Sequence, residues 1–124
     1  MNIPEELCYS KTHEWVRFEG DEAVIGITEY AAEELGDLVF VGLAEEGDEV
    51  TADQSFTDVE SVKAVAEVNS PVSGTIKAVN AELEDAPERI NEAPYEAWFI
   101  KVGDITGKSE LMSAEEYEAY LKTL

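Results

Sequence analysis

The stretch from Asp58 to Val68 limits the possible folds of this chain more than any other. Valines recur through it at positions 59, 62, 65 and 68. β-Branched side chains of this kind favour extended backbone. The segment therefore predicts two short strands joined by a turn. Lys63 would then lie at or near the tip of a hairpin, in a segment that also contains three carboxylates.

A lysine at a rigid hairpin tip has two interpretations. It can be an ordinary solvated turn residue, which is the usual state of surface lysines. It can also be an attachment point for a prosthetic group, because a modifying enzyme can reach the amine and the loaded arm can then swing freely. The pattern around Lys63 alone leaves both interpretations open.

The rest of the chain predicts further short strands separated by turn residues. Residues 1–11 are expected to be an irregular lead-in, and residues 83–94 a loop with one helical turn. Strands are expected at 15–18 and 23–27, on either side of a Glu19–Asp21 turn, and at 38–41, where the apolar run predicts a buried strand. Others are expected at 56–60, 64–69, 75–80 and 97–102. This arrangement predicts a mainly β fold of two antiparallel sheets, as a sandwich or flattened barrel.

Two helices are predicted beside the strands. Thr28 is a good N-cap and Gly36 a good left-handed end, which predicts a short helix near 28–36. Ser113 and Glu116 have the spacing of a capping box. Apolar residues follow them at helical spacing, which predicts an amphipathic C-terminal helix near 113–123 that packs on the sheets.

Composition excludes several classes of partner. The chain has 124 residues, a length that fits one domain over 1–124, and 44% of them are apolar. Acidic residues outnumber basic ones 29 to 8, which gives a net charge of −21. Such a charge repels nucleic acid and anionic membranes, so neither is expected as a partner. The acids are spread through the chain, which predicts a solvated coat suited to a high-salt host.

Nothing in the sequence points to a membrane, a metal or a catalytic centre. No apolar run reaches the roughly 20 residues that a membrane span needs, and no targeting segment is recognisable. We therefore expect a soluble, cytoplasmic protein. Cys8 and His13 are each the only residue of their type, so they predict neither a metal site nor a nucleophile–base pair, and a structural role is expected for His13.

Several motifs together carry a family resemblance that covers almost the whole chain. The central ones are Val59–Ala64 and the following Asn69–Ile76. The others, in order, are Lys11–Val16, Gly26–Thr28, Leu35–Asp37, Val39–Val41, Gly47–Asp48 and Asn91–Tyr95, with Trp98 close behind. This combination resembles the H-protein family of the glycine cleavage system. The resemblance implies a lipoyl-domain-like barrel-sandwich hybrid with the two helices added.

The resemblance also implies a function and a site. Lipoate would be joined by an amide to Lys63, and Glu60 and Ala64 would help the lipoylating enzyme to recognise it. The arm would receive an aminomethyl group from glycine decarboxylase and present it to a tetrahydrofolate-dependent aminomethyltransferase. Because the loaded group carries an amine, we expect Thr12 and Glu14 to contact it.

The remaining implications concern partners and alternatives. Dihydrolipoyl dehydrogenase would reoxidise the arm, and a lipoate ligase or lipoyl transferase would install it. The chain would be a monomeric carrier that performs no chemistry unaided.

 As alternatives, an H-like protein could relay lipoate to other carrier domains, or an unmodified one could act only as a docking module. Val62 stands where lipoyl domains of 2-oxo acid dehydrogenases usually have Asp, and biotin carriers usually have methionine on both sides of the lysine. Gly42 and Ala44 depart from the family pattern, which puts loop geometry and partner affinity in doubt rather than lipoylation.

Overall fold

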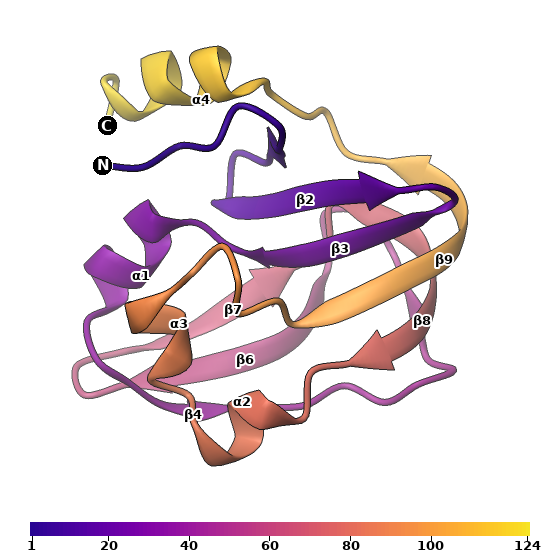
Figure 1. Ribbon diagram of the computed structural model, residues 1–124, viewed down its shortest axis with the longest axis horizontal. Coiled ribbons are helices and arrows are strands. Elements are labelled where there is room, and N and C mark those ends of the chain that lie inside the picture. Colours follow the sequence, from indigo (N-terminus) through magenta and orange to yellow (C-terminus); the bar gives the residue numbers. More distant parts are fainter.

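The computed structural model describes residues 1–124 as two antiparallel sheets with four short helices (Figure 1). The larger sheet has the strand order β1-β2-β3-β9-β8-β5 and the smaller one the order β4-β6-β7. The strands are β1 (Cys8–Tyr9), β2 (Glu14–Glu19), β3 (Glu22–Ile27), β4 (Leu38–Val41), β5 (Glu49–Val50), β6 (Ser55–Ser61), β7 (Val65–Asn69), β8 (Val72–Val79) and β9 (Ile100–Lys108). The helices are α1 (Glu29–Leu35), α2 (Glu82–Asp85), α3 (Arg89–Glu92) and α4 (Ala114–Leu121). This confirms the predicted mainly β fold.

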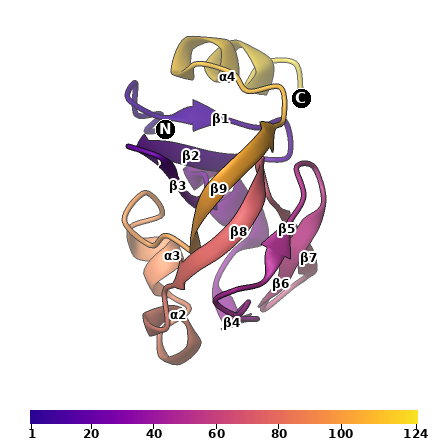
Figure 2. The ribbon, with the colours of Figure 1, turned by 90° about the vertical axis from the view of Figure 1, so that its right-hand side faces the viewer.

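Strand β3 and the first half of β2 are buried on both faces. Val16 and Ile25 point into the main core between the two sheets. Trp15 and Val24 point the other way, into a smaller apolar cluster beneath α4 and the N-terminal segment. Figure 2 shows this outer layer, with α4 and β1 on the side of β2 away from β6 and β7. Burial on both faces explains why β3 is an almost continuous apolar run.

The close pairing of β2 with β3 depends on one glycine. Trp15 lies opposite Gly26 in the register of the two strands. A Cβ atom on Gly26 would lie 2.6 Å from the indole ring of Trp15, so any larger residue would collide with the ring. The indole nitrogen of Trp15 donates to the carbonyl of Pro94 at 3.0 Å, which fixes the ring in this position.

The predicted hairpin around Lys63 is present. Strands β6 and β7 pair antiparallel with Asp58 opposite Glu67 and Glu60 opposite Val65. Residues 62–64 connect the two strands. In Figure 1 the tip of this hairpin lies at the left edge of the molecule, below α1.

Both predicted helices are present, and one end differs in detail. Thr28 caps α1, with its side chain accepting from the backbone N–H of Ala31, and Ser113 and Glu116 form the predicted capping box of α4. Gly36 ends α1 at φ 80° and ψ −159°. The φ is positive as predicted, but this ψ lies outside the left-handed helical region and in one that essentially only glycine adopts.

Several boundaries predicted from the sequence are wrong. The lead-in contains β1, and residues 83–94 contain most of α2 and all of α3 in place of one helical turn. The last strand begins at Ile100 and runs to Lys108, because residues 97–99 form irregular backbone that bonds partly to 93–96. Strand β4 is not buried throughout. A register shift between Leu38 and Phe40 leaves Val39 and Phe40 54% and 51% exposed.

Candidate functional site

The turn that carries Lys63 is held by the side chain of Ser61. The Ser61 backbone N–H donates to the Ala64 carbonyl at 2.8 Å. The return bond goes to the hydroxyl and not to the carbonyl, because Ala64 N–H donates to Ser61 Oγ at 3.0 Å and Lys63 N–H donates to the same oxygen at 3.2 Å. The hydroxyl thus fixes the backbone on both sides of the lysine side chain.

A short segment after α1 ties the hairpin tip to the rest of the fold. Val62 N–H donates to the carbonyl of Asp37 at 3.0 Å. The Asn91 side chain holds the residues on either side of Asp37, because its Oδ1 accepts from Leu38 N–H at 2.9 Å and its Nδ2 donates to the Gly36 carbonyl at 2.8 Å. We call residues 36–38 the strap. The strap holds the backbone of the hairpin tip in place, so the point from which the Lys63 side chain leaves the backbone is fixed.

Lys63 differs from most other lysines of the chain. Its side chain is exposed and its amine makes no hydrogen bond or ion pair. Four of the other five lysines are engaged, in ion pairs with Asp104 (Lys77) and Glu118 (Lys122), or over the rings of Trp98 (Lys101) and Phe18 (Lys108). Lys11 is the other lysine without such a partner. Lys63 therefore offers a free amine on an ordered base.

A cavity of about 190 Å³ lies between α1 and the hairpin. Its apolar lining comes from α1, the end of β3 and the inner side of the hairpin, and its acidic lining from three separate elements. The apolar residues are Ile27, Ala31, Leu35, Val59, Ala66 and Val68, the acids are Glu14, Glu34 and Glu67, and Thr12, His13 and Tyr30 complete the wall. An apolar cavity lined in part by acids suits an aliphatic chain that ends in a cation.

Glu14 is the buried acid of this cavity, with 2% of its surface exposed. Its Oε1 accepts from the hydroxyls of Ser10 and Thr12, and its Oε2 accepts from the Asn69 backbone N–H at 3.2 Å. Burial raises the pKa of the Glu14 carboxyl, and the hydrogen bonds from Thr12, Ser10 and Asn69 oppose that rise. The carboxyl group is therefore fixed in orientation at the base of the hairpin.

His13, between Thr12 and Glu14, is tied to the C-terminal helix. Its Nδ1 lies 2.8 Å from Tyr117 Oη, which lies 2.8 Å from the buried Thr28 hydroxyl. Thr28 Oγ1 also accepts from Ala31 N–H at 3.2 Å, so this chain of hydrogen bonds reaches the N-terminal end of α1. Burial lowers the pKa of His13, which favours the neutral imidazole.

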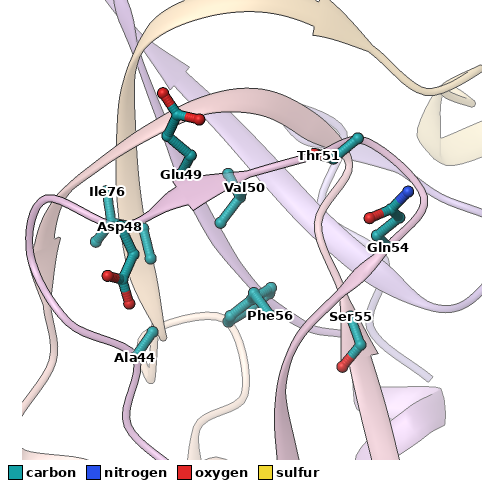
Figure 3. Close-up of a pocket in the computed structure, with 9 residues that line it drawn as sticks. All are labelled: Ala44, Asp48, Glu49, Val50, Thr51, Gln54, Ser55, Phe56 and Ile76. Atoms are coloured by element: carbon teal, nitrogen blue, oxygen red, sulfur yellow. The ribbon is translucent and has the colours of Figure 1, made fainter.

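A second hollow, of about 310 Å³, lies beside β5 (Figure 3). Its wall includes Asp48, Glu49, Gln54, Phe56 and Ile76. None of the site residues predicted from the sequence lines it. No group of three or more His, Cys, Asp or Glu residues is arranged to hold a metal ion.

The predicted site residues fall into two groups joined by the hairpin. Glu60, Lys63 and Ala64 lie exposed at or next to the tip, while Thr12 and Glu14 line the far part of the cavity. Sequence reasoning missed Ser61 and Asn91, which fix the tip. Asn91 stands in the motif Asn91–Tyr95, so a signal existed, but the motif does not reveal which backbone groups the amide binds.

Comparison with known proteins agrees with this geometry. Residues 7–124 match the family described as Glycine cleavage H-protein. The chain belongs to this family. A glycine cleavage system H protein of Lachnoclostridium phytofermentans is 57% identical over 123 residues, which cover 98% of this chain and 97% of the relative. One from Halalkalibacterium halodurans is 58% identical over 120 residues, or 94% of each.

Solved structures support the same assignment. The crystal structure of a glycine cleavage system H protein from Mycobacterium marinum superposes with a TM-score of 0.91 at 40% sequence identity, covering 98% of this chain and all of that one. The predicted fold class is thereby confirmed. No helix in the chain is long and apolar enough to cross a membrane.

Proposed function

We propose that the chain carries lipoate on Lys63 and serves as the shuttle of the glycine cleavage system. The family is a non-catalytic lipoyl carrier, and membership covers residues 7–124. The observation that carries the assignment to Lys63 is its free, exposed amine on a hairpin tip fixed by Ser61 and the strap. We further propose that residues 1–124 act as one domain.

The residues around Lys63 fit this group. The aliphatic part of Lys63 rests against Gly36, where no side chain takes up the space, and the apolar cavity begins at the adjacent Leu35. When bound, lipoate supplies a dithiolane whose sulfur accepts an aminomethyl group and whose disulfide is restored by oxidation. The chain itself supplies the fixed base, the apolar walls and the acids.

The acids of the cavity give it a preference for a cation. The amine of an aminomethyl group is cationic near neutral pH, and Glu14, Glu34 and Glu67 line the same cavity. Thr12 and Glu14 contact that amine in this proposal, with Thr12 and Ser10 holding the carboxyl group of Glu14 in place. An amine held there is sheltered from water, which lengthens the lifetime of the loaded form.

The partners follow from membership in the system. We propose glycine decarboxylase, aminomethyltransferase and dihydrolipoyl dehydrogenase as the enzymes served, and a lipoate ligase or lipoyl transferase as the modifying enzyme. Glu60 and Ala64, both exposed beside Lys63, are the residues that the modifying enzyme reads. A monomer located in the cytoplasm remains the expectation from the sequence.

Mass spectrometry of Lys63→Arg and Lys11→Arg tests the attachment site. Both variants keep the positive charge and both remove a lysine without an ion pair. After incubation with a lipoate ligase, lipoate and ATP, we expect the lipoyl increment on the natural sequence and on Lys11→Arg only. An increment on Lys63→Arg, or none on the natural sequence, would contradict the proposal.

Glu14→Gln tests the cavity contact. The amide keeps the size of the side chain and removes its charge, and the hydroxyls of Ser10 and Thr12 can reorient to accept from it. We expect normal lipoylation and a several-fold shorter lifetime of the aminomethyl group on the purified, loaded chain. The control is Glu49→Gln, which alters an exposed acid at the second hollow, beside β5. Equal lifetimes in both variants would reject the contact.

A further inference from the structure

The position of Gly36 beside Lys63 carries a further inference, which rests on the proposed function. A Cβ atom built on Gly36 would lie 3.3 Å from Lys63 Cε and 3.9 Å from both Cδ and Nζ. The distance to Cε is tighter than ordinary van der Waals contact. The Lys63 side chain thus lies against the end of α1, and a side chain at position 36 would push it away by a few tenths of an ångström.

The backbone at Gly36 cannot easily move aside. Its N–H donates to the Ala32 carbonyl at 3.0 Å, and its carbonyl accepts from Asn91 Nδ2 at 2.8 Å. The tip is tied to the same strap through Val62 and Asp37. The separation between Gly36 and the base of Lys63 is therefore set by hydrogen bonds on both sides.

The cavity is lined by the residues that precede Gly36 on α1. Leu35, next to Gly36, and Glu34 before it both line the cavity, and Ala31 lies one helical turn back on α1. An arm that leaves Lys63 across Gly36 meets this apolar wall and, farther on, Glu14. We propose that Gly36 is a positioning residue for the lipoyl arm, because its missing side chain leaves open the passage from the hairpin tip into the cavity.

Gly36→Ala tests this passage, with Gly47→Ala as the matched control. Gly47 also has a positive φ, of 95°, but a Cβ atom there would have nothing within 4 Å. The control therefore carries backbone strain without the contact. We expect both variants to be lipoylated, because the amine stays exposed at the tip.

Two measurements on the lipoylated chains separate the variants. In nuclear magnetic resonance spectra, aminomethyl loading should shift the signals of Leu35 and Ala31 in the natural sequence and in Gly47→Ala, and leave them unchanged in Gly36→Ala. The aminomethyl group should also be lost several-fold faster from Gly36→Ala. If Gly36→Ala showed the same signal shifts on loading and the same aminomethyl lifetime as the natural sequence, the inference would be overturned.

The natural sequence allows a test without any substitution. The Lys63 methylene protons should show nuclear Overhauser effects to the Gly36 Hα atoms, and their absence would overturn the inference even if Gly36→Ala does not fold. A natural chain that takes no lipoate at Lys63 would refute the proposed function. A lipoylated natural chain with no Gly36 contact would refute only the role of Gly36.

Discussion

Replacing Asn91 by Ala should loosen the hairpin tip from a distance. The side chain makes two hydrogen bonds, to Leu38 N–H and to the Gly36 carbonyl, at 2.9 and 2.8 Å, and both are partly buried. A hydrogen bond of this kind contributes about 1 kcal/mol, so the loss of both should lower the free energy of unfolding by about 2 kcal/mol. For a chain of this length that corresponds to a fall in Tm of roughly 8 °C.

The assay combines denaturation with amide hydrogen exchange at Val62. Because Val62 N–H donates to Asp37 within the strap, weakening the strap by about 2 kcal/mol should speed the exchange of this amide roughly 30-fold. Asn80→Ala is the control, since it removes one amide bond of 2.9 Å, to the Trp98 carbonyl. It should cost about 1 kcal/mol without selective exchange at Val62. If Asn91→Ala and Asn80→Ala gave the same profile at Val62, the strap would not hold the tip.

Three further predictions concern other contacts. Ser61→Ala removes the acceptor for Lys63 N–H and Ala64 N–H. It should lower the free energy of unfolding, measured in urea, by about 1 kcal/mol, and it should slow lipoylation. Unchanged lipoylation kinetics would show that the turn needs no hydroxyl. Tyr117→Phe removes the hydroxyl that bonds both Thr28 Oγ1 and His13 Nδ1 and should cost about 2 kcal/mol, whereas Tyr120→Phe, whose hydroxyl bond is exposed, should cost little; similar losses would count against this chain of bonds. Burial lowers the pKa of His13 below its ordinary value of 6.5, so the unfolded state binds more protons than the folded state as the pH falls through 6.5. The free energy of unfolding should therefore fall with pH in this range. His13→Asn should remove this part of the pH dependence, as measured by denaturation at several pH values.

The sequence predicted the parts of the fold that depend on local chemistry. The capping residues Thr28 and Ser113 and the hairpin around Lys63 lie where expected, because caps and turns are specified by neighbouring residues. The exposure of Val39 and Phe40 could not be predicted, since it follows from a register shift against β6, a partner distant in sequence.

The candidate site divides in the same way. Lys63, Thr12 and Glu14 could be named from motifs, but the cavity that Thr12 and Glu14 line between α1 and the hairpin depends on how these two elements pack. The roles of Gly36 and Asn91 depend on contacts with residues far along the chain, such as Asn91 with the strap. Residue spacing carries no signal for such contacts.

The indole of Trp15 over Gly26 has a consequence for strand alignment. In a sheet with one wet face, a slip of one residue would expose apolar side chains, so polarity alone defines the alignment. Strand β3 is apolar on both faces. A slip of one residue would exchange Val24 and Ile25 between the smaller apolar cluster and the main core, and would expose neither. Here side-chain size defines the register in place of polarity, because only Gly26 leaves room for the indole of Trp15. Any register that placed a larger residue opposite Trp15 would produce a steric clash.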